Sequence, residues 1–205
     1  MTTQAAAMFL EVNFDIHQIS ETLEWKFWRR DNDGNPHKGK DAGIINFTVN
    51  EPFHLQITAG SYRPFDNFRV VDCVMITRPY IYRCGPDVAT EYAPPSPFLP
   101  QGPGQTMGAT FTFPDDEFKL KTEEDHQIGY FRRRQVWTDH LTVGGFTGRW
   151  EIYFVLTVEI PRNGLPPELR VFSFDPEGTV TTGEDSPEAV SASLMPEGTV
   201  TTGAD

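Results

Sequence analysis

The carboxylate residues are the side chains of this sequence best suited to chemistry, because they can bind a cation or move a proton. Asp31, Asp33 and Asn35 fall at alternate positions, which is the spacing of the first oxygen ligands in a calcium-binding loop. The rest of such a loop is missing, since Pro36 stands where a glycine is required and Ala42 where a bidentate glutamate would bind. We therefore predict a hairpin turn here rather than a metal site.

Two further acidic clusters occupy residues 115–117 and 123–125. Carboxylates on adjacent loops can bind calcium weakly, but a solvated acidic surface explains them better. The formal net charge of −12 repels nucleic-acid phosphates. The basic run at residues 132–134 follows the second acidic cluster closely enough for local ion pairs. We therefore expect no nucleic-acid partner.

The histidines and cysteines give no sign of zinc binding or catalysis. The sequence has no His-Glu-x-x-His, Cys-x-x-Cys, Gly-x-Ser-x-Gly, Walker or dinucleotide-binding pattern. Asp139 and His140 are adjacent, but neighbours on a strand face opposite sides of a sheet and would not form a catalytic pair. The sequence thus predicts a protein that is not an enzyme and has no cofactor and no metal. The histidines, expected on strands or at the surface, are His17, His37, His54, His126 and His140.

Tryptophan rings provide flat faces on which sugars can stack. Trp25 and Trp150 fall on the apolar side of alternating segments, so we expect them in the core. Trp28 and Trp137 fit the alternation less clearly. An alternative function is therefore a lectin-like or calcium-assisted carbohydrate-binding module, which would use the acidic loops and a proline-rich loop.

The elements that position these side chains are segments in which apolar and polar residues alternate. A period of two is typical of half-buried β-strands, and no amphipathic helix pattern separates the segments. We therefore predict an all-β fold, an antiparallel β-sandwich of the Ig-like or jelly-roll-like kind, as one domain over residues 1–174. The expected strands lie at residues 10–16, 23–27, 45–49, 53–57, 68–76, 109–113, 128–131, 135–138, 150–158 and 169–174.

Proline and glycine mark the connections between these strands. Residues 85–108 contain six prolines, which excludes a helix or a central strand and predicts a long Pro-rich loop. Loops of this length are commonly binding loops, lids or subunit arms. The pairs at 33–34 and 163–164, Asp-Gly and Asn-Gly, predict tight turns between strands.

An octapeptide occurs twice near the end of the chain. Pro-Glu-Gly-Thr-Val-Thr-Thr-Gly fills residues 176–183 and again residues 196–203. The extended tail, residues 175–205, has no aromatic side chain and cannot bury enough apolar surface to fold by itself. Each Thr-Val-Thr run suits a short edge strand added to another subunit, so we predict a self-assembling structural protein, a homo-oligomer or filament. The predicted partner-binding residues are Thr179, Val180, Thr181, Thr199, Val200 and Thr201.

Four parts of the chain, about half of its length, share a pattern with known proteins: residues 9–16, 25–36 and 44–57, and the ending at 154–156 followed by 174–176. Together they resemble the small bacterial DP-EP proteins and, more distantly, the AidA/PixA inclusion-body proteins. The resemblance implies a compact β-sandwich without an established catalytic activity. It carries over no functional residue, and the Pro-rich loop and duplicated tail depart from it.

The sequence also bears on where the protein is located. Residues 1–10 lack the basic region and apolar length of a signal peptide, and no stretch approaches the ~20 apolar residues of a membrane span. We expect a cytoplasmic protein with no membrane span, with signal-independent export as the alternative. Cys73 and Cys84 could pair across neighbouring strands, or remain two buried thiols as a reducing compartment favours.

Overall fold

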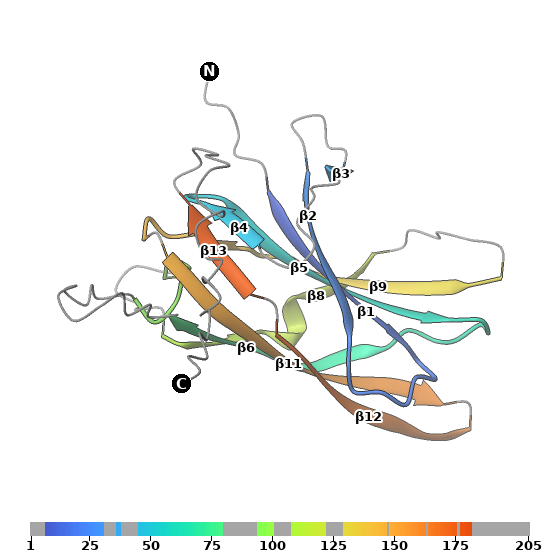
Figure 1. Cartoon of the computed structure of the whole chain (residues 1–205). Helices are drawn as coiled ribbons and strands as arrows, with labels where there is room; N and C mark the ends of the chain where they lie inside the picture. The colour runs from blue at the N-terminus through green and yellow to red at the C-terminus, as the bar shows by residue number, and fades with distance from the viewer. Residues whose placement is uncertain are drawn as a thin grey trace, which may run out of the picture.

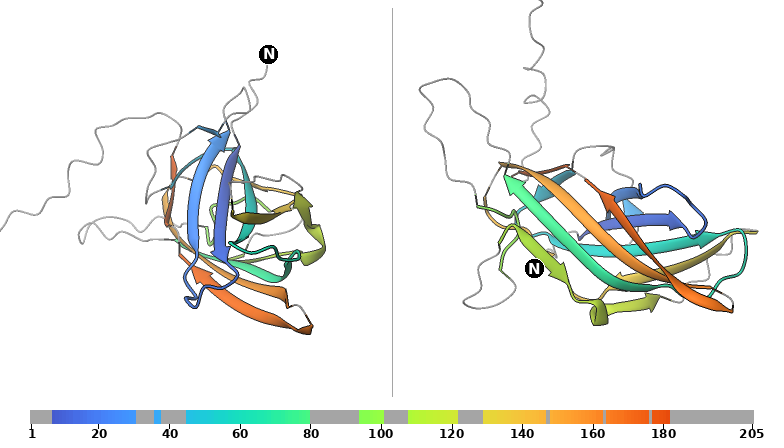
Figure 2. Two further views of the ribbon diagram at one scale, coloured as in Figure 1. Left: turned by 90° about the vertical axis from the view of Figure 1, so that its right-hand side faces the viewer. Right: turned by 90° about the horizontal axis from the view of Figure 1, so that it is seen from below.

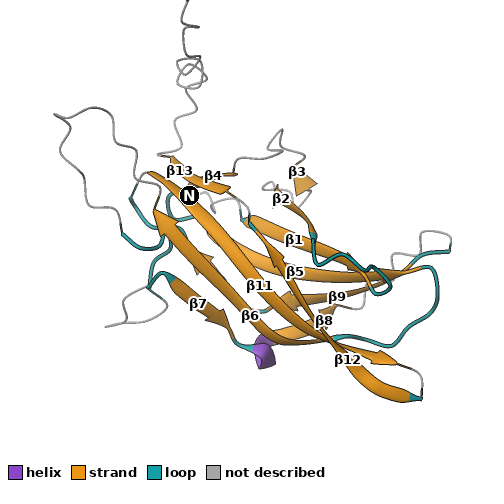
Figure 3. Cartoon of the chain, turned by 60° about the horizontal axis from the view of Figure 1, so that its bottom comes forward, coloured by secondary structure: helices purple, strands orange, loops and turns teal. Residues whose placement is uncertain are grey.

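The computed structural model describes residues 7–30, 36–37, 45–79, 94–100, 108–121, 129–146, 148–162, 164–175 and 177–181. Two β-sheets face each other in the described chain, and its only helical element is a 3₁₀ turn, η1 (Asp115–Glu117), between two strands (Figures 1 and 3). The predicted all-β sandwich is confirmed. Figure 2 shows the two layers from the side and from below.

The first layer, sheet A, is built around a parallel pair, β1 and β5, while its other pairings are antiparallel. The parallel pair arises because the chain leaves sheet A after the β2–β3 hairpin, passes through β4 in the other sheet, and returns on the far side of β1. In spatial order the strands are β3 (Pro36–His37), β2 (Glu24–Arg30), β1 (Met8–Asp15), β5 (Pro52–Ser61), β9 (Phe131–Trp137) and β8 (Phe118–Lys121), with β10 (Leu141–Thr142) paired to the start of β5.

The second layer, sheet B, is built around the longest strand, β11. One edge of β11 pairs with β6, and the other is shared by β12 and β13. β4 pairs with β13 in parallel, so each sheet contains a parallel pairing that the antiparallel prediction lacked. In spatial order the strands are β4 (Ile45–Thr48), β13 (Glu177–Thr181), β11 (Gly148–Arg162), β6 (Arg69–Pro79) and β7 (Thr110–Phe113), with β12 (Leu165–Phe174) beside β11.

The core lies between the sheets and is rich in aromatic rings. Alternation decides which side chains reach it, because successive residues of a strand point to opposite faces. On β11 every second residue from Trp150 to Ile160 is buried, and on β1 the residues Leu10, Val12 and Phe14 are buried. The largest side chains that are almost fully buried are Trp137, Trp150, Phe47, Phe53, Phe68, Phe113, Phe154 and Phe172.

Most predicted strands are found within a few residues of their expected bounds. The segments predicted at 128–131 and 135–138 are instead one strand, β9, which continues through the three arginines at 132–134. The strands β3, β8 and β10 were not predicted; β3 and β10 have two residues each, too few to show an alternation. The turn predicted at 163–164 joins β11 to β12, and Gly164 has a φ of 72°.

Candidate functional site

The first copy of the octapeptide forms a strand inside sheet B. β13 lies between β4 and β11 (Figure 1). Gly178 pairs with Trp150 on one side and with Ile45 on the other, and Val180 pairs with Gly148 and Phe47 in the same way. Within this chain Thr179, Val180 and Thr181 are therefore in an interior strand rather than at an edge. Their assignment as partner-binding residues stays a prediction.

β13 continues β12 along β11 without a change of register. Phe174 pairs with Phe154 and Glu177 with Glu151, so the same number of residues separates the two pairs on each strand. Pro176 falls at the junction and has no N–H to donate to the ladder. Among the described residues, the sandwich therefore includes a strand beyond residue 174, the end predicted for the domain.

The second copy, including Thr199, Val200 and Thr201, lies outside the described residues. Its sequence is nevertheless informative, because residues 197–201 are identical to the five residues of β13. The backbone pairing that β13 makes with β4 and β11 is available to this segment if it enters the same position in the same register.

The described part of the Pro-rich loop, residues 94–100, packs on the sandwich. Phe98 is buried, with its ring 5.6 Å from Phe47 and 5.2 Å from Phe53 between centroids. The Trp150 indole N–H donates to the Pro94 carbonyl at 3.2 Å. This part of the loop therefore contributes to the core; residues 85–93 and 101–107 lie outside the described residues.

The tryptophans divide between the core and the surface. Trp137 and Trp150 are buried, and Trp25 is partly buried against the core. Trp28 lies on the outer face of sheet A, where its ring stacks on Phe9 with centroids 4.2 Å apart. The core assignment of Trp150 is confirmed, and Trp137 also belongs to the core.

The acidic residues that the structure describes do not form a metal site. Within the described ranges, no group of three or more histidine, cysteine, aspartate or glutamate side chains could hold a metal ion. Glu117, in η1, accepts a hydrogen bond from the Trp137 indole N–H at 2.8 Å, which is a structural role. The carboxylates at residues 31, 33 and 123–125 lie outside the described residues.

Asp139 and His140 lie in the turn between β9 and β10 rather than on a strand. The expectation that they face apart is corrected, because the turn brings His140 Nδ1 to 3.4 Å from Asp139 Oδ1. Both side chains are about half exposed.

Of the two cysteines, Cys73 is a buried free thiol on β6. Burial, with a smaller effect of the Asp72 charge, raises the pKa of this thiol. Cys84 lies outside the described residues.

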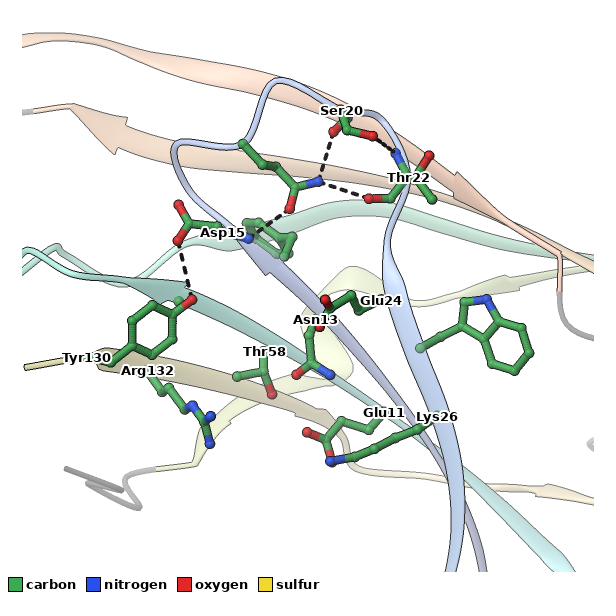
Figure 4. Close-up of a pocket in the computed structure, with 14 residues that line it drawn as sticks. Glu11, Asn13, Asp15, Ser20, Thr22, Glu24, Lys26, Thr58, Tyr130 and Arg132 are labelled. Carbon is green, nitrogen blue, oxygen red and sulfur yellow. Dashed lines mark hydrogen bonds and ion pairs between the residues drawn. The ribbon is translucent and has the colours of Figure 1, made fainter. Parts of the chain in front are cut away.

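A hollow that the sequence did not reveal lies over the outer face of sheet A (Figure 4). Its volume is about 510 Å³, within the range of about 300–1,000 Å³ that is common for ligand sites. β1, β2, β5 and β9 provide its floor, and the β1–β2 connection forms one wall. The residues come from distant parts of the chain, so no sequence motif marks them.

Comparison with known proteins gives no relative: no family model, curated protein or solved structure matches this chain. The resemblance to the DP-EP and AidA/PixA proteins therefore stays a prediction. No helix among the described residues is long and apolar enough to cross a membrane.

Proposed function

We propose that this protein is a non-enzymatic self-assembly protein whose subunits associate by exchanging the duplicated strand. The second copy of the octapeptide from one subunit would replace β13 between β4 and β11 of another. The observation that supports this is the position of the first copy, which pairs on both edges with segments distant in sequence. A sheet position that accepts one copy provides the same pairing surface for the other, because the two sequences are identical.

Exchange of identical strands leaves the number of backbone hydrogen bonds unchanged. Its free energy therefore depends on the cost of opening the β13 position and on protein concentration, not on new contacts. Reciprocal exchange between two subunits gives a closed dimer, whereas exchange in one direction gives rings or filaments. We expect assembly that is slow and increases with concentration.

The proposal includes a cytoplasmic location, since a buried thiol such as Cys73 needs no oxidising compartment. It also includes no catalytic role and no nucleic-acid partner, in keeping with the net charge of −12.

The two copies offer a matched pair of variants for testing the proposal. Val180→Pro disrupts the first copy, because an interior strand does not tolerate a residue that lacks an N–H. Val200→Pro makes the same change at the equivalent position of the second copy. Sedimentation velocity over a concentration series, with electron microscopy of the concentrated samples, gives the size distribution of each protein.

We expect Val200→Pro to abolish assembly while leaving the circular dichroism spectrum unchanged. Val180→Pro should leave the β13 position open to the second copy and increase the assembled fraction. The proposal is rejected if wild-type protein stays monomeric throughout the series, or if Val200→Pro assembles to the same extent as the wild type.

A further inference from the structure

The hollow over sheet A contains a buried hydroxyl without a partner. Thr58 is on β5 and lines the hollow, and only 5% of its surface is exposed. Its Oγ1 has no hydrogen-bond partner among the described residues. Buried polar groups are almost always hydrogen-bonded, and an unpaired one costs about 1–3 kcal/mol. Thr58 lies at the floor, between Asn13 of β1 and the β9 strand (Figure 4). Its Oγ1 is covered by neighbouring atoms, so a ligand can pair with this hydroxyl only if the side chains over it move aside.

The wall of the hollow is held in place by its own hydrogen bonds. In the β1–β2 connection, Gln18 Oε1 accepts from the Asp15 backbone N–H at 2.9 Å. The Gln18 amide group donates to the Ser20 and Thr22 carbonyls at 2.8 and 3.0 Å (Figure 4). A wall fixed in this way needs little rearrangement when a ligand enters.

A tyrosine closes the end of the hollow next to this wall. The Tyr130 hydroxyl donates to Asp15 Oδ2 at 3.3 Å, and the Arg132 guanidinium lies 5.8 Å from the centre of the Tyr130 ring. The ring lies against Gly60, where a Cβ atom would overlap the Tyr130 hydroxyl. The absence of a side chain at Gly60 therefore allows Tyr130 to take this position.

The hollow is lined by charges of both signs. Glu11 Oε2 accepts from the Gln56 amide at 2.9 Å and is 3.2 Å from Lys26 Nζ, which fixes one side of the floor. Asp15 and Glu24 supply two more carboxylates, and Arg132 a second cation. A strongly charged ligand of either sign would meet groups of its own sign. Neutral hydroxyl groups, which both donate and accept, can pair with all of these side chains.

We propose that this hollow is a binding site for a neutral, hydroxyl-rich ligand, a saccharide unit, with Thr58, Asn13 and Tyr130 among its hydrogen-bonding groups. The site is on sheet A, away from β13 in sheet B, and it does not depend on strand exchange. Nor does it use the acidic loops or a calcium ion, the features on which the carbohydrate-binding alternative in the sequence rested.

The test is a titration of the full-length ¹⁵N-labelled protein followed by two-dimensional NMR. The probes are glucose, galactose, mannose, N-acetylglucosamine and their β-linked disaccharides, with inorganic phosphate and spermidine as charged probes. At least one saccharide should shift the amide resonances of Thr58 and Gly60 in a saturable manner. The proposal is overturned if no saccharide shifts these resonances, or if only a charged probe does.

Two variants establish where the saccharide binds. Thr58→Val removes the unpaired hydroxyl at nearly constant shape, and it should weaken binding by about twofold to tenfold, the value of one hydrogen bond. Gly60→Ala should displace Tyr130 and weaken binding as well. Thr157→Val on β11, the same change in the other sheet, is the control and should leave the affinity unchanged. Binding that survives both pocket variants at wild-type affinity would refute the assignment.

Discussion

A buried ion pair between β2 and the β4–β5 connection provides the sharpest test of how the sandwich is held together. Glu51 follows β4 in the chain, and its side chain is only 2% exposed. It accepts from Arg29 of sheet A through Nε at 2.7 Å and Nη2 at 3.2 Å, and from the Thr48 backbone N–H at 3.0 Å. Arg29 also donates to the Asn46 carbonyl of β4. The ion pair thus connects β2 to the β4–β5 connection, and the bond to Asn46 joins the same arginine to β4 of sheet B.

Arg29→Met should destabilise the protein strongly, because it leaves the Glu51 carboxylate buried without its cation, while the Thr48 N–H still donates to it. Removing one partner of a buried pair costs about 3–5 kcal/mol. With a urea m value of about 2–3 kcal/mol/M, the midpoint of unfolding should fall by about 1–2.5 M. Urea titration followed by tryptophan fluorescence measures this shift.

Two further variants separate charge burial from loss of packing. The double variant Arg29→Met/Glu51→Gln removes both charges and keeps an oxygen for the Thr48 N–H, so it should recover most of the lost stability. Arg69→Met, which breaks the exposed pair with Glu159, should cost at most about 1 kcal/mol. If Arg29→Met costs no more than Arg69→Met, or if the double variant is as unstable as the single one, the account of a buried charge is incorrect.

Three other predictions follow from buried groups. Phe98→Ala should lower the free energy of unfolding by about 3–5 kcal/mol in urea titration, because this loop residue fills the core. Burial, followed by the charge and hydrogen bond of Asp15, raises the pKa of Tyr130. The phenolate absorbance of Tyr130, measured as the difference between the wild type and Tyr130→Phe, should therefore appear above pH ~10. In Asp15→Asn this absorbance should appear at a lower pH than in the wild type. The folded state holds the Tyr130 hydroxyl proton more tightly than the unfolded state does. The contribution of this group to the free energy of unfolding is therefore present below pH ~10 and is lost as the pH rises through the pKa of Tyr130 in the folded state. In a Cys84→Ser background, Cys73 should react with iodoacetamide only after unfolding, because burial raises the pKa of the thiol and shields it.

The sequence was sufficient to predict the strands in which one face is apolar. In β1, β5 and β11 the buried apolar residues recur every second position, so the period of two is visible without any knowledge of partners. β9 was predicted as two strands because three arginines interrupt its apolar pattern. In the structure these arginines are half-buried, since their long apolar stems can lie along the sheet while the charged ends remain near water.

The candidate sites show what a single sequence cannot supply. β13 has few apolar side chains, and its placement is defined by backbone pairing with β4 and β11, which composition does not predict. The hollow depends on register: Glu24, Asn13 and Thr58 are aligned across three strands, although they are far apart in the chain. Neither the β1–β5 parallel pairing nor this alignment follows from local alternation.

The two copies of the octapeptide are identical in sequence but not in the loop that each must close. The β13 segment of the first copy, residues 177–181, follows Phe174 after two residues, whereas the same segment of the second copy, residues 197–201, would need the 22 residues from 175 to 196 to reach the same register. At about 0.6 kcal/mol for each doubling of loop length, the first copy is favoured within one chain by about 2 kcal/mol.

This difference determines how the copies should behave in assembly. A preference of about 2 kcal/mol leaves the second copy in its own β13 position in only a few per cent of chains. The second copy therefore remains available to other chains, but it can enter only a β13 position that the first copy has left. Shortening the 22-residue connection should help the second copy replace the first in the β13 position of its own chain, and so reduce assembly. Lengthening the connection by 22 residues should change the free energy of this replacement by only about 0.6 kcal/mol. Equal assembly by a shortened and a lengthened variant would show that loop closure does not control the competition.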